Sequence, residues 1–134
     1  MRFYERNAMQ TRERFLKYYL YIFGFASALI ITIVPVIFGD TFLWQPRNIP
    51  TEIMIASIYL TMGIIMILVA RNPIKQKAFI DFIILANTLH ASVMLFFAQN
   101  PAHIILDVIP IGLMGLLPLF MYPWGLHNFL REYH

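Results

Sequence analysis

Four apolar stretches, each long enough to cross a lipid bilayer, constrain the fold of this chain more than any other feature. They cover residues 15–38, 52–70, 78–98 and 102–122. A helix needs about 20 apolar residues to cross the hydrocarbon core, which is about 30 Å thick. None of the stretches alternates strictly like a barrel strand, and lipid offers no partner to unpaired backbone groups. The sequence therefore predicts an all-α integral membrane protein with four spanning helices.

Composition favours a membrane protein over a soluble domain. Charged residues make up 13% of the 134 residues, against about 25% in typical soluble domains. A soluble fold of this length has too little interior to bury so much apolar surface, so we expect a single membrane domain over residues 1–134. The chain has no cysteine, which excludes disulfides, thiolate metal sites and cysteine nucleophiles.

The segments between the apolar stretches carry turn-forming residues. Residues 39–50 include one glycine and two prolines, residues 71–77 are short and polar, and Pro101 stands where the last stretch begins. Glycine and proline mark turns, and short connections make neighbouring helices antiparallel. The sequence thus predicts an antiparallel, up-down four-helix bundle.

Basic residues collect on one side of this predicted bundle. Nine lie there, against Arg47 alone on the other side: Arg2, Arg6, Arg12, Arg14, Lys17, Arg71, Lys75, Lys77 and Arg131. By the positive-inside rule, we expect both termini to be cytoplasmic; the bacterial inner membrane is expected only from the family resemblance given below. Residues 1–14 form a basic cytoplasmic tail, either as a short interfacial helix or as a solvated segment. Because the charge borders apolar stretches, we expect the lipid bilayer as partner and no nucleic acid.

Polar residues inside the apolar stretches are the candidate functional residues. At 1.5 Å per residue, His90 lies about 12 Å and Asp107 about 8 Å below the outer end of the bundle. A charged group in a membrane helix is costly, so these side chains are expected to face inward. We predict one outer-leaflet cluster made of Glu52, Tyr59, Asn87, His90, His103 and Asp107. Asp81, one turn into its helix and near Lys77, is expected in a surface ion pair or reaching to the interface.

Three interpretations of this cluster stay open. It is a hydrogen-bonded network that holds helices in register, a proton or ion relay, or a metal or redox site. In the last case His90, His103 and Asp107, with Glu52 as a further ligand, suit zinc, copper or iron. No soluble-enzyme motif is present. The preferred interpretation is a non-enzymatic accessory subunit or binding module, with a membrane-protein partner or a second copy in a homo-oligomer.

Small residues and prolines add two predictions about the helices. Gly112 and Gly115, together with Ala56 and Gly63, are candidates for close helix packing, because small side chains let helix backbones approach. Prolines inside the apolar stretches are expected to kink their helices. These are Pro35, Pro110 and Pro118.

Three segments of the chain resemble a known family. They read "EIMIASIYLTMGIIMILVARNP", "NTLHASVMLFFA" and "HIILDVIPIGLMGLL", and they are similar to small four-helix bacterial membrane proteins of unknown function. The resemblance covers residues 52–117 and implies the same fold, but it supplies no activity. The matching positions are Tyr59, Gly63, Arg71, Asn72, Pro73, His90, Val93, Met94, His103 and Asp107.

Overall fold

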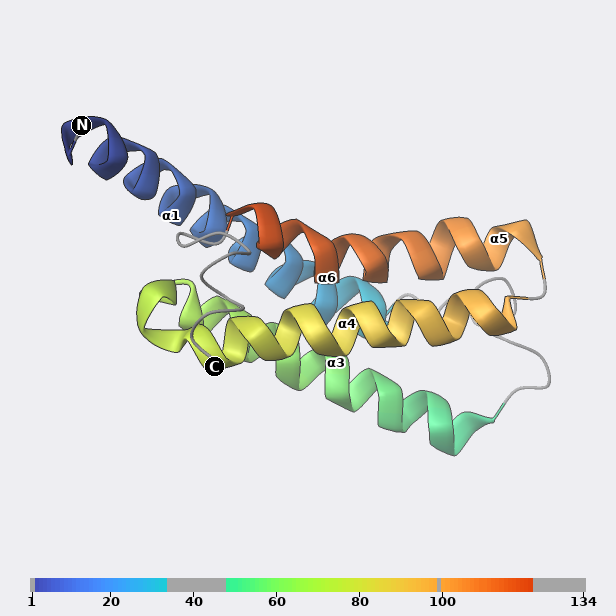
Figure 1. Ribbon diagram of the computed structural model, residues 1–134. Coiled ribbons are helices and arrows are strands. Elements are labelled where there is room, and N and C mark those ends of the chain that lie inside the picture. Colours follow the sequence, from blue (N-terminus) through green and yellow to red (C-terminus); the bar gives the residue numbers. More distant parts are fainter. Residues whose placement is uncertain (1, 34–47, 99, 122–134) are drawn as a thin grey trace. The chain divides into compact units, whose positions relative to one another are not determined.

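The computed structural model describes residues 2–33, 48–98 and 100–121 (Figure 1). These residues form helices and short connections, with no strand among them. In chain order the elements are α1 (Arg2–Phe25), the π-helix η1 (Ala26–Ile31), α3 (Ile49–Val69), the 3₁₀-helix η2 (Pro73–Gln76), α4 (Lys77–Phe97), α5 (Pro101–His103), the π-helix η3 (Ile104–Val108) and α6 (Ile109–Met121). The all-α prediction is therefore confirmed for the described residues.

Two helices begin at an asparagine cap that is followed by proline. The Asn48 side chain accepts the backbone N–H of Thr51 at 3.2 Å, at the start of α3. The Asn100 Oδ1 atom accepts the backbone N–H of His103 at 3.1 Å, at the start of α5. A cap of this kind satisfies a backbone donor that has no partner within the helix. Proline in the first turn loses no helix hydrogen bond.

Three helical segments are long and apolar enough to cross a membrane: Ile49–Val69, Pro73–Phe97 and Pro101–Met121. Their limits lie close to those predicted for the last three stretches. The predicted first span, 15–38, extends past residue 33 and so lies partly outside the described residues. Residues 2–14, predicted as a tail, are helical and continuous with that span. An ion pair between Lys17 Nζ and Glu13 Oε1, at 2.8 Å, joins residues one turn apart on α1 and stabilises this helix.

The chain divides into two compact units. One, here called the α3 unit, comprises residues 19–71. The other, called the α4–α6 unit, comprises residues 1–18 and 72–134. The four-helix up-down bundle stays a prediction, because each unit is described by itself.

Close glycine contacts join the helices of the α3 unit. A Cβ added to Gly63 of α3 would lie 2.5 Å from the Gly24 carbonyl oxygen and 2.6 Å from the Ala28 nitrogen. Further along, the Thr32 hydroxyl approaches the Ala56 carbonyl oxygen at 3.5 Å. The residue numbers along α1 and η1 therefore increase as those of their contacts on α3 decrease. The two helices pack antiparallel.

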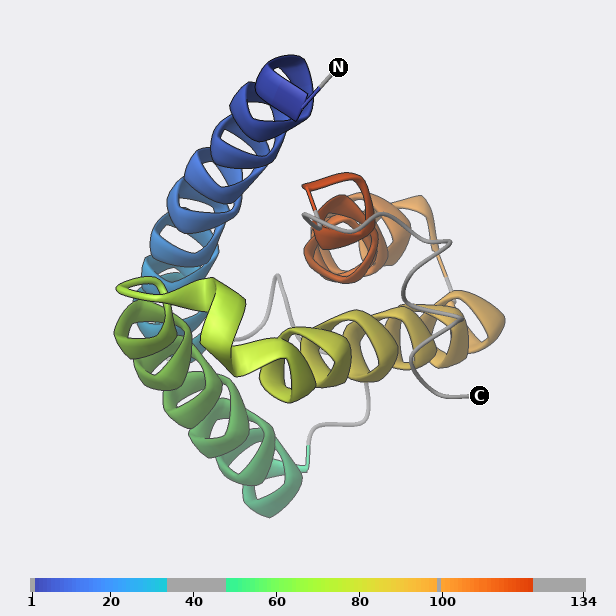
Figure 2. The same ribbon diagram turned by 60° about the vertical axis from the view of Figure 1, so that its left-hand side comes forward.

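Glycines also join α4 to α6, which lie side by side in both views (Figures 1 and 2). A Cβ on Gly115 would lie 2.6 Å from Thr88 Oγ1 and 2.7 Å from the Thr88 nitrogen. A Cβ on Gly112 would lie 3.6 Å from the Ala91 Cβ. The predicted role in close helix packing is thus confirmed for Gly63 and Gly115, whereas Gly112 leaves room for an ordinary contact.

The prolines act differently from one another. Directly before Pro110, the helix widens into η3, and the N–H of Ile109 donates to the Ile104 carbonyl five residues back. Proline lacks an N–H and its ring crowds the preceding turn, so a wide turn accommodates it. Pro118 lies inside α6, which continues past it to Met121. Pro35 lies outside the described residues.

Candidate functional site

Four of the six predicted cluster residues belong to the α4–α6 unit. Asn87 and His90 lie on α4, His103 ends α5, and Asp107 lies in η3. Asn87 and His103 are buried, with 2% and 9% of their surfaces exposed, and His90 and Asp107 are half-buried. Each of the four has an interaction partner in the structure. Asn87 and His103 therefore lie in the interior of the unit, whereas His90 and Asp107, the two residues expected to face inward, are only partly enclosed.

Local hydrogen bonds hold two of these side chains. The Asn87 Nδ2 atom donates to the Ile83 carbonyl one turn earlier, at 2.9 Å, which ties the amide to its own helix. The His103 Nε2 atom lies 3.4 Å from the Asn100 Nδ2 atom. The Asn100 side chain thus contacts both the backbone nitrogen and the imidazole ring of His103. It places the imidazole at the start of the last helix.

Glu52 and Tyr59 belong to the α3 unit. Glu52 is half-buried in the first turn of α3, and Tyr59 is buried two turns later. Tyr59 shares the buried stripe of α3 with Met62, Gly63 and Met66. Both residues have interaction partners. The structure describes them within their own unit, so the six-residue cluster stays a prediction.

The register between α4 and α6 separates the histidines and Asp107 along the helix axis. Ala91 is level with Gly112 and Thr88 with Gly115, so each step forward on α4 matches one step back on the last helix. Asp107 is then level with Phe96, six positions beyond His90, which corresponds to about 9 Å. His90 is level with Leu113, and His103 precedes Leu113 by ten positions, which corresponds to at most about 15 Å along the axis. A common depth for these groups is not supported.

His90 and Asp81, which both lie on α4, point in different directions from that helix. Successive residues of an α-helix are about 100° apart. Ala91 contacts α6 through Gly112, so His90 points to the flank of the α6-facing stripe. Asp81 is nine positions before His90 and lies on the opposite side of α4. Asp81 and His90 therefore do not form a pair on α4, and the predicted relay through the cluster stays a prediction.

The metal-site prediction gains no support either. Within the described residues, no group of three or more His, Cys, Asp or Glu side chains is placed to hold a metal ion. For His90, His103 and Asp107, the axial spread gives the physical reason, because metal–ligand bonds of about 2 Å require ligands that converge on one point. The zinc, copper or iron expected there stays a prediction.

Two buried polar atoms lie on α4, one on Asp81 and one on Thr88, which the sequence did not single out. Asp81 was expected at the surface, yet its Oδ1 atom is buried, and Asp81 has an interaction partner. The Thr88 Oγ1 atom is buried beside Gly115 and has no hydrogen-bond partner among the described residues. The two residues are seven positions apart and share a helix face. That spacing is the signal that would have singled out Thr88.

No family model, no curated protein and no solved structure matches this chain. The resemblance to small four-helix bacterial membrane proteins therefore stays a prediction. Function is inferred below from the residues and their geometry alone.

Proposed function

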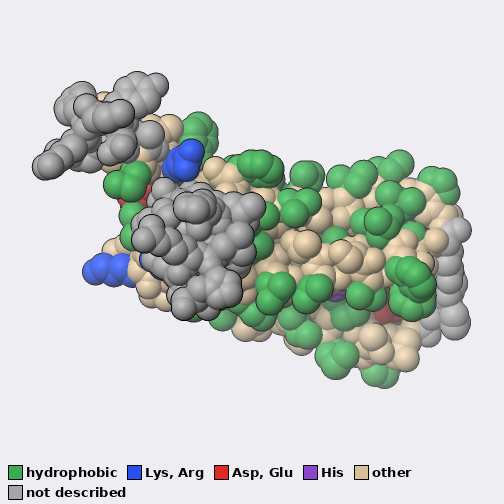
Figure 3. Space-filling view, viewed as in Figure 1, with side chains coloured by type: hydrophobic (Ala, Val, Ile, Leu, Met, Phe, Trp, Pro, Cys, Tyr) green, Lys and Arg blue, Asp and Glu red, His purple; other side chains and the backbone are tan. Residues whose placement is uncertain are grey.

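We propose that this chain is a multi-pass inner-membrane protein that acts as a non-enzymatic accessory subunit or binding module. One observation carries the proposal: in each of the three candidate spans, only 28% of the most apolar window is buried inside the molecule. The rest is half-buried or exposed and rich in large apolar side chains, such as Phe96 at 82% and Phe120 at 78% exposed. Figure 3 shows hydrophobic side chains spread along the visible face. Lipid, or another membrane helix, is the environment that such surfaces suit.

Hydroxyl groups on the exposed faces form hydrogen bonds within their own helices, as an apolar environment requires. The hydroxyl groups on them donate to carbonyls of their own helix: Ser57 to Met54 at 2.7 Å, Thr61 to Ser57 at 2.8 Å and Ser92 to Thr88 at 2.8 Å. These bonds remove the cost of a bare hydroxyl in hydrocarbon. The outer surface thus offers large apolar side chains and satisfied hydroxyls to a neighbour in the bilayer.

The small residues that would favour tight self-association are already used inside the units. At all four described glycines, an added Cβ would lie within 3.6 Å of an atom of another helix: Gly24, Gly63, Gly112 and Gly115. Membrane helices associate closely through such residues. This favours a partner that packs against the bulky outer faces over a glycine-mediated homo-oligomer.

Site-specific photo-crosslinking in native membranes tests the accessory role. A photoreactive residue replaces the exposed Leu60, Val93 or Leu113, one on each span, with the buried Ile83 as control. We expect one face to give a discrete protein adduct of constant mass, while the other faces and Ile83 give none. Lipid adducts alone from every exposed face would contradict a partner-binding role.

The predicted orientation has its own test, because the chain lacks cysteine. Single cysteines at the exposed Thr51, Ala102 and Gln76 are treated with an impermeant thiol reagent on intact spheroplasts. With both termini cytoplasmic, Thr51→Cys and Ala102→Cys label from outside, and Gln76→Cys labels only after lysis. The opposite pattern would reverse the proposed topology.

A further inference from the structure

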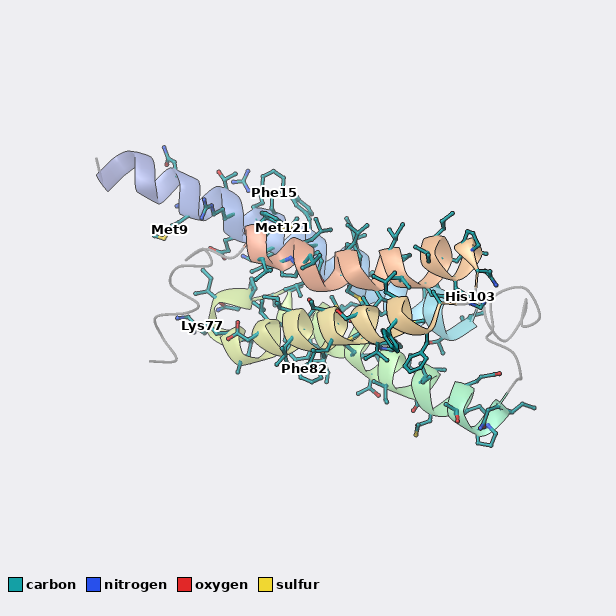
Figure 4. All side chains as sticks on the ribbon, turned by 45° about the vertical axis from the view of Figure 1, so that its right-hand side comes forward. Met9, Phe15, Lys77, Phe82, His103 and Met121 are labelled. Carbon is teal, nitrogen blue, oxygen red and sulfur yellow. The ribbon has the colours of Figure 1, made fainter. Side chains whose placement is uncertain are left out.

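Positive charge gathers at one end of the α4–α6 unit. Lys77 and Phe15 lie toward the same end as Met121, and His103 lies at the other end (Figure 4). The cations at this end are called the basic rim: Arg12, Arg14, Lys17, Lys75 and Lys77. Arg12, Arg14 and Lys75 are exposed, and Lys17 and Lys77 are half-buried.

The other end of the unit has no comparable charge. Residues 82–106 contain no Asp, Glu, Lys or Arg, and neither do residues 108–130. Asp107 alone is charged between residues 82 and 130. In the described part of the unit, α4 to α6 therefore form an apolar body whose lysines lie at one end.

Carboxylates neutralise only part of the rim. Lys17 pairs with Glu13 at 2.8 Å, and Asp81 follows Lys77 by one helical turn. Five cations face these two carboxylates, which leaves a net charge of +3 on the rim. The three exposed cations lie on two separate segments, with Arg12 and Arg14 on α1 and Lys75 on η2. The positive charge of the rim is therefore not confined to one helix.

Exposed aromatic residues place the rim at a membrane surface. Phe15 is 56% exposed and Tyr18 is 59% exposed, on the same helix as Arg12 and Arg14. Aromatic side chains favour the headgroup region of a bilayer, where an apolar ring and a polar edge are both accommodated. In a bilayer with these aromatic residues at headgroup level, lipid phosphates would lie next to the rim.

We propose that the basic rim binds the headgroups of anionic phospholipids and enriches them around this protein. The proposal rests on the membrane insertion proposed above. Each lysine or arginine close to an anionic bilayer surface raises lipid affinity by about fivefold. A nucleic acid is a poor fit, because the rim directly borders the apolar spans. Free phosphate lacks the acyl chains that would lie against those spans.

The test compares two spin-labelled lipids around the full-length protein in phosphatidylcholine bilayers. Electron paramagnetic resonance measures the motionally restricted fraction of spin-labelled phosphatidylglycerol and of spin-labelled phosphatidylcholine. We expect the wild-type chain to favour phosphatidylglycerol several-fold. Neutralising one rim cation lowers this preference only in part, and the triple variant R12Q/R14Q/K75Q brings it close to parity. The matched triple variant R12K/R14K/K75R keeps the charge and the preference.

Four outcomes overturn the inference. Equal restriction of both lipids around wild-type protein that has inserted rejects lipid selection and leaves the proposed membrane function intact. Equal loss in the charge-keeping variant shows that charge is not the cause. Loss of the preference on adding millimolar glycerophosphate identifies a phosphate site instead of a lipid surface. Failure of the chain to insert at all rejects both proposals. In 1 M salt, where the Debye length is about 3 Å, a headgroup preference should weaken.

Discussion

Replacing Gly115 with alanine should loosen the contact between α4 and α6, and the structure allows the cost to be worked out. The new Cβ would lie 2.7 Å from the Thr88 backbone nitrogen and 2.6 Å from its Oγ1 atom. Rotation of the Thr88 side chain cannot move the backbone nitrogen. To reach an ordinary separation of about 3.5 Å, the two helices must move apart by about 0.8 Å.

Two opposing terms decide the magnitude. Overpacking a close contact typically costs about 1–3 kcal/mol, and alanine recovers up to about 1 kcal/mol because it restricts the unfolded chain more than glycine does. We expect Gly115→Ala to lower the free energy of unfolding by about 1–2 kcal/mol. The matched control is Gly112→Ala on the same helix. There the added Cβ would meet Ala91 at 3.6 Å, an ordinary contact, so stability should stay level or rise by up to about 1 kcal/mol.

The assay is reversible unfolding in mixed micelles as the fraction of sodium dodecyl sulfate rises. Because the chain lacks cysteine, two dyes attached at introduced cysteines on α4 and α6 report their separation. Equal stability of the Gly115→Ala and Gly112→Ala variants would refute the close approach of α4 and α6 and the register derived from it.

Three further predictions use the same unfolding assay. Gly63→Ala should destabilise the protein more than Gly24→Ala. The Gly63 Cβ would meet backbone atoms at 2.5 and 2.6 Å, whereas the nearest atom to a Gly24 Cβ is a side-chain carbon at 2.9 Å. The reverse order of stabilities would contradict this. Thr88→Val should leave stability level or raise it by about 1 kcal/mol, since it removes a buried hydroxyl without a described partner; a clear loss would reveal a partner. Asn100→Ala should cost about 0.5–2 kcal/mol through the lost cap, and Asn100→Asp should retain the cap; equal losses would argue against capping.

The spans were predictable because their signals are local. A run of apolar residues sets the length of each helix, and an asparagine followed by proline marks where α3 and α5 begin. The glycines at helix contacts were also predictable by type. Their pairing was not, because spacing along one helix does not reveal which residue of another helix stands opposite. Gly115 meets Thr88, and this pairing sets the register between the two helices.

The polar residues show the limit of depth estimates. Counting from the ends of the apolar stretches placed His90 and Asp107 at similar depths, whereas the glycine contacts separate them by about 9 Å. The count missed the offset because helix ends are uncertain by several residues and because η3 advances less per residue than an α-helix. Asp81 was expected at the surface, and the structure shows a half-buried residue whose Oδ1 atom is buried. Its ion pair with Lys77 stays a prediction, because a lysine one turn away in the sequence does not fix the depth of the carboxylate.

The wide turn of η3 has a consequence for changes in chain length. At η3 (Ile104–Val108), the N–H of Ile109 bonds to the carbonyl of Ile104, five residues earlier. In an α-helix the bonded residues are four apart, so this turn contains one extra residue. Deleting one residue there would restore regular α-spacing while His103 and the glycines of α6 keep their facing directions. The same deletion between Gly112 and Gly115 would turn the rest of the helix by about 100°. Length variation among related sequences should therefore be tolerated in this turn and rejected one turn later.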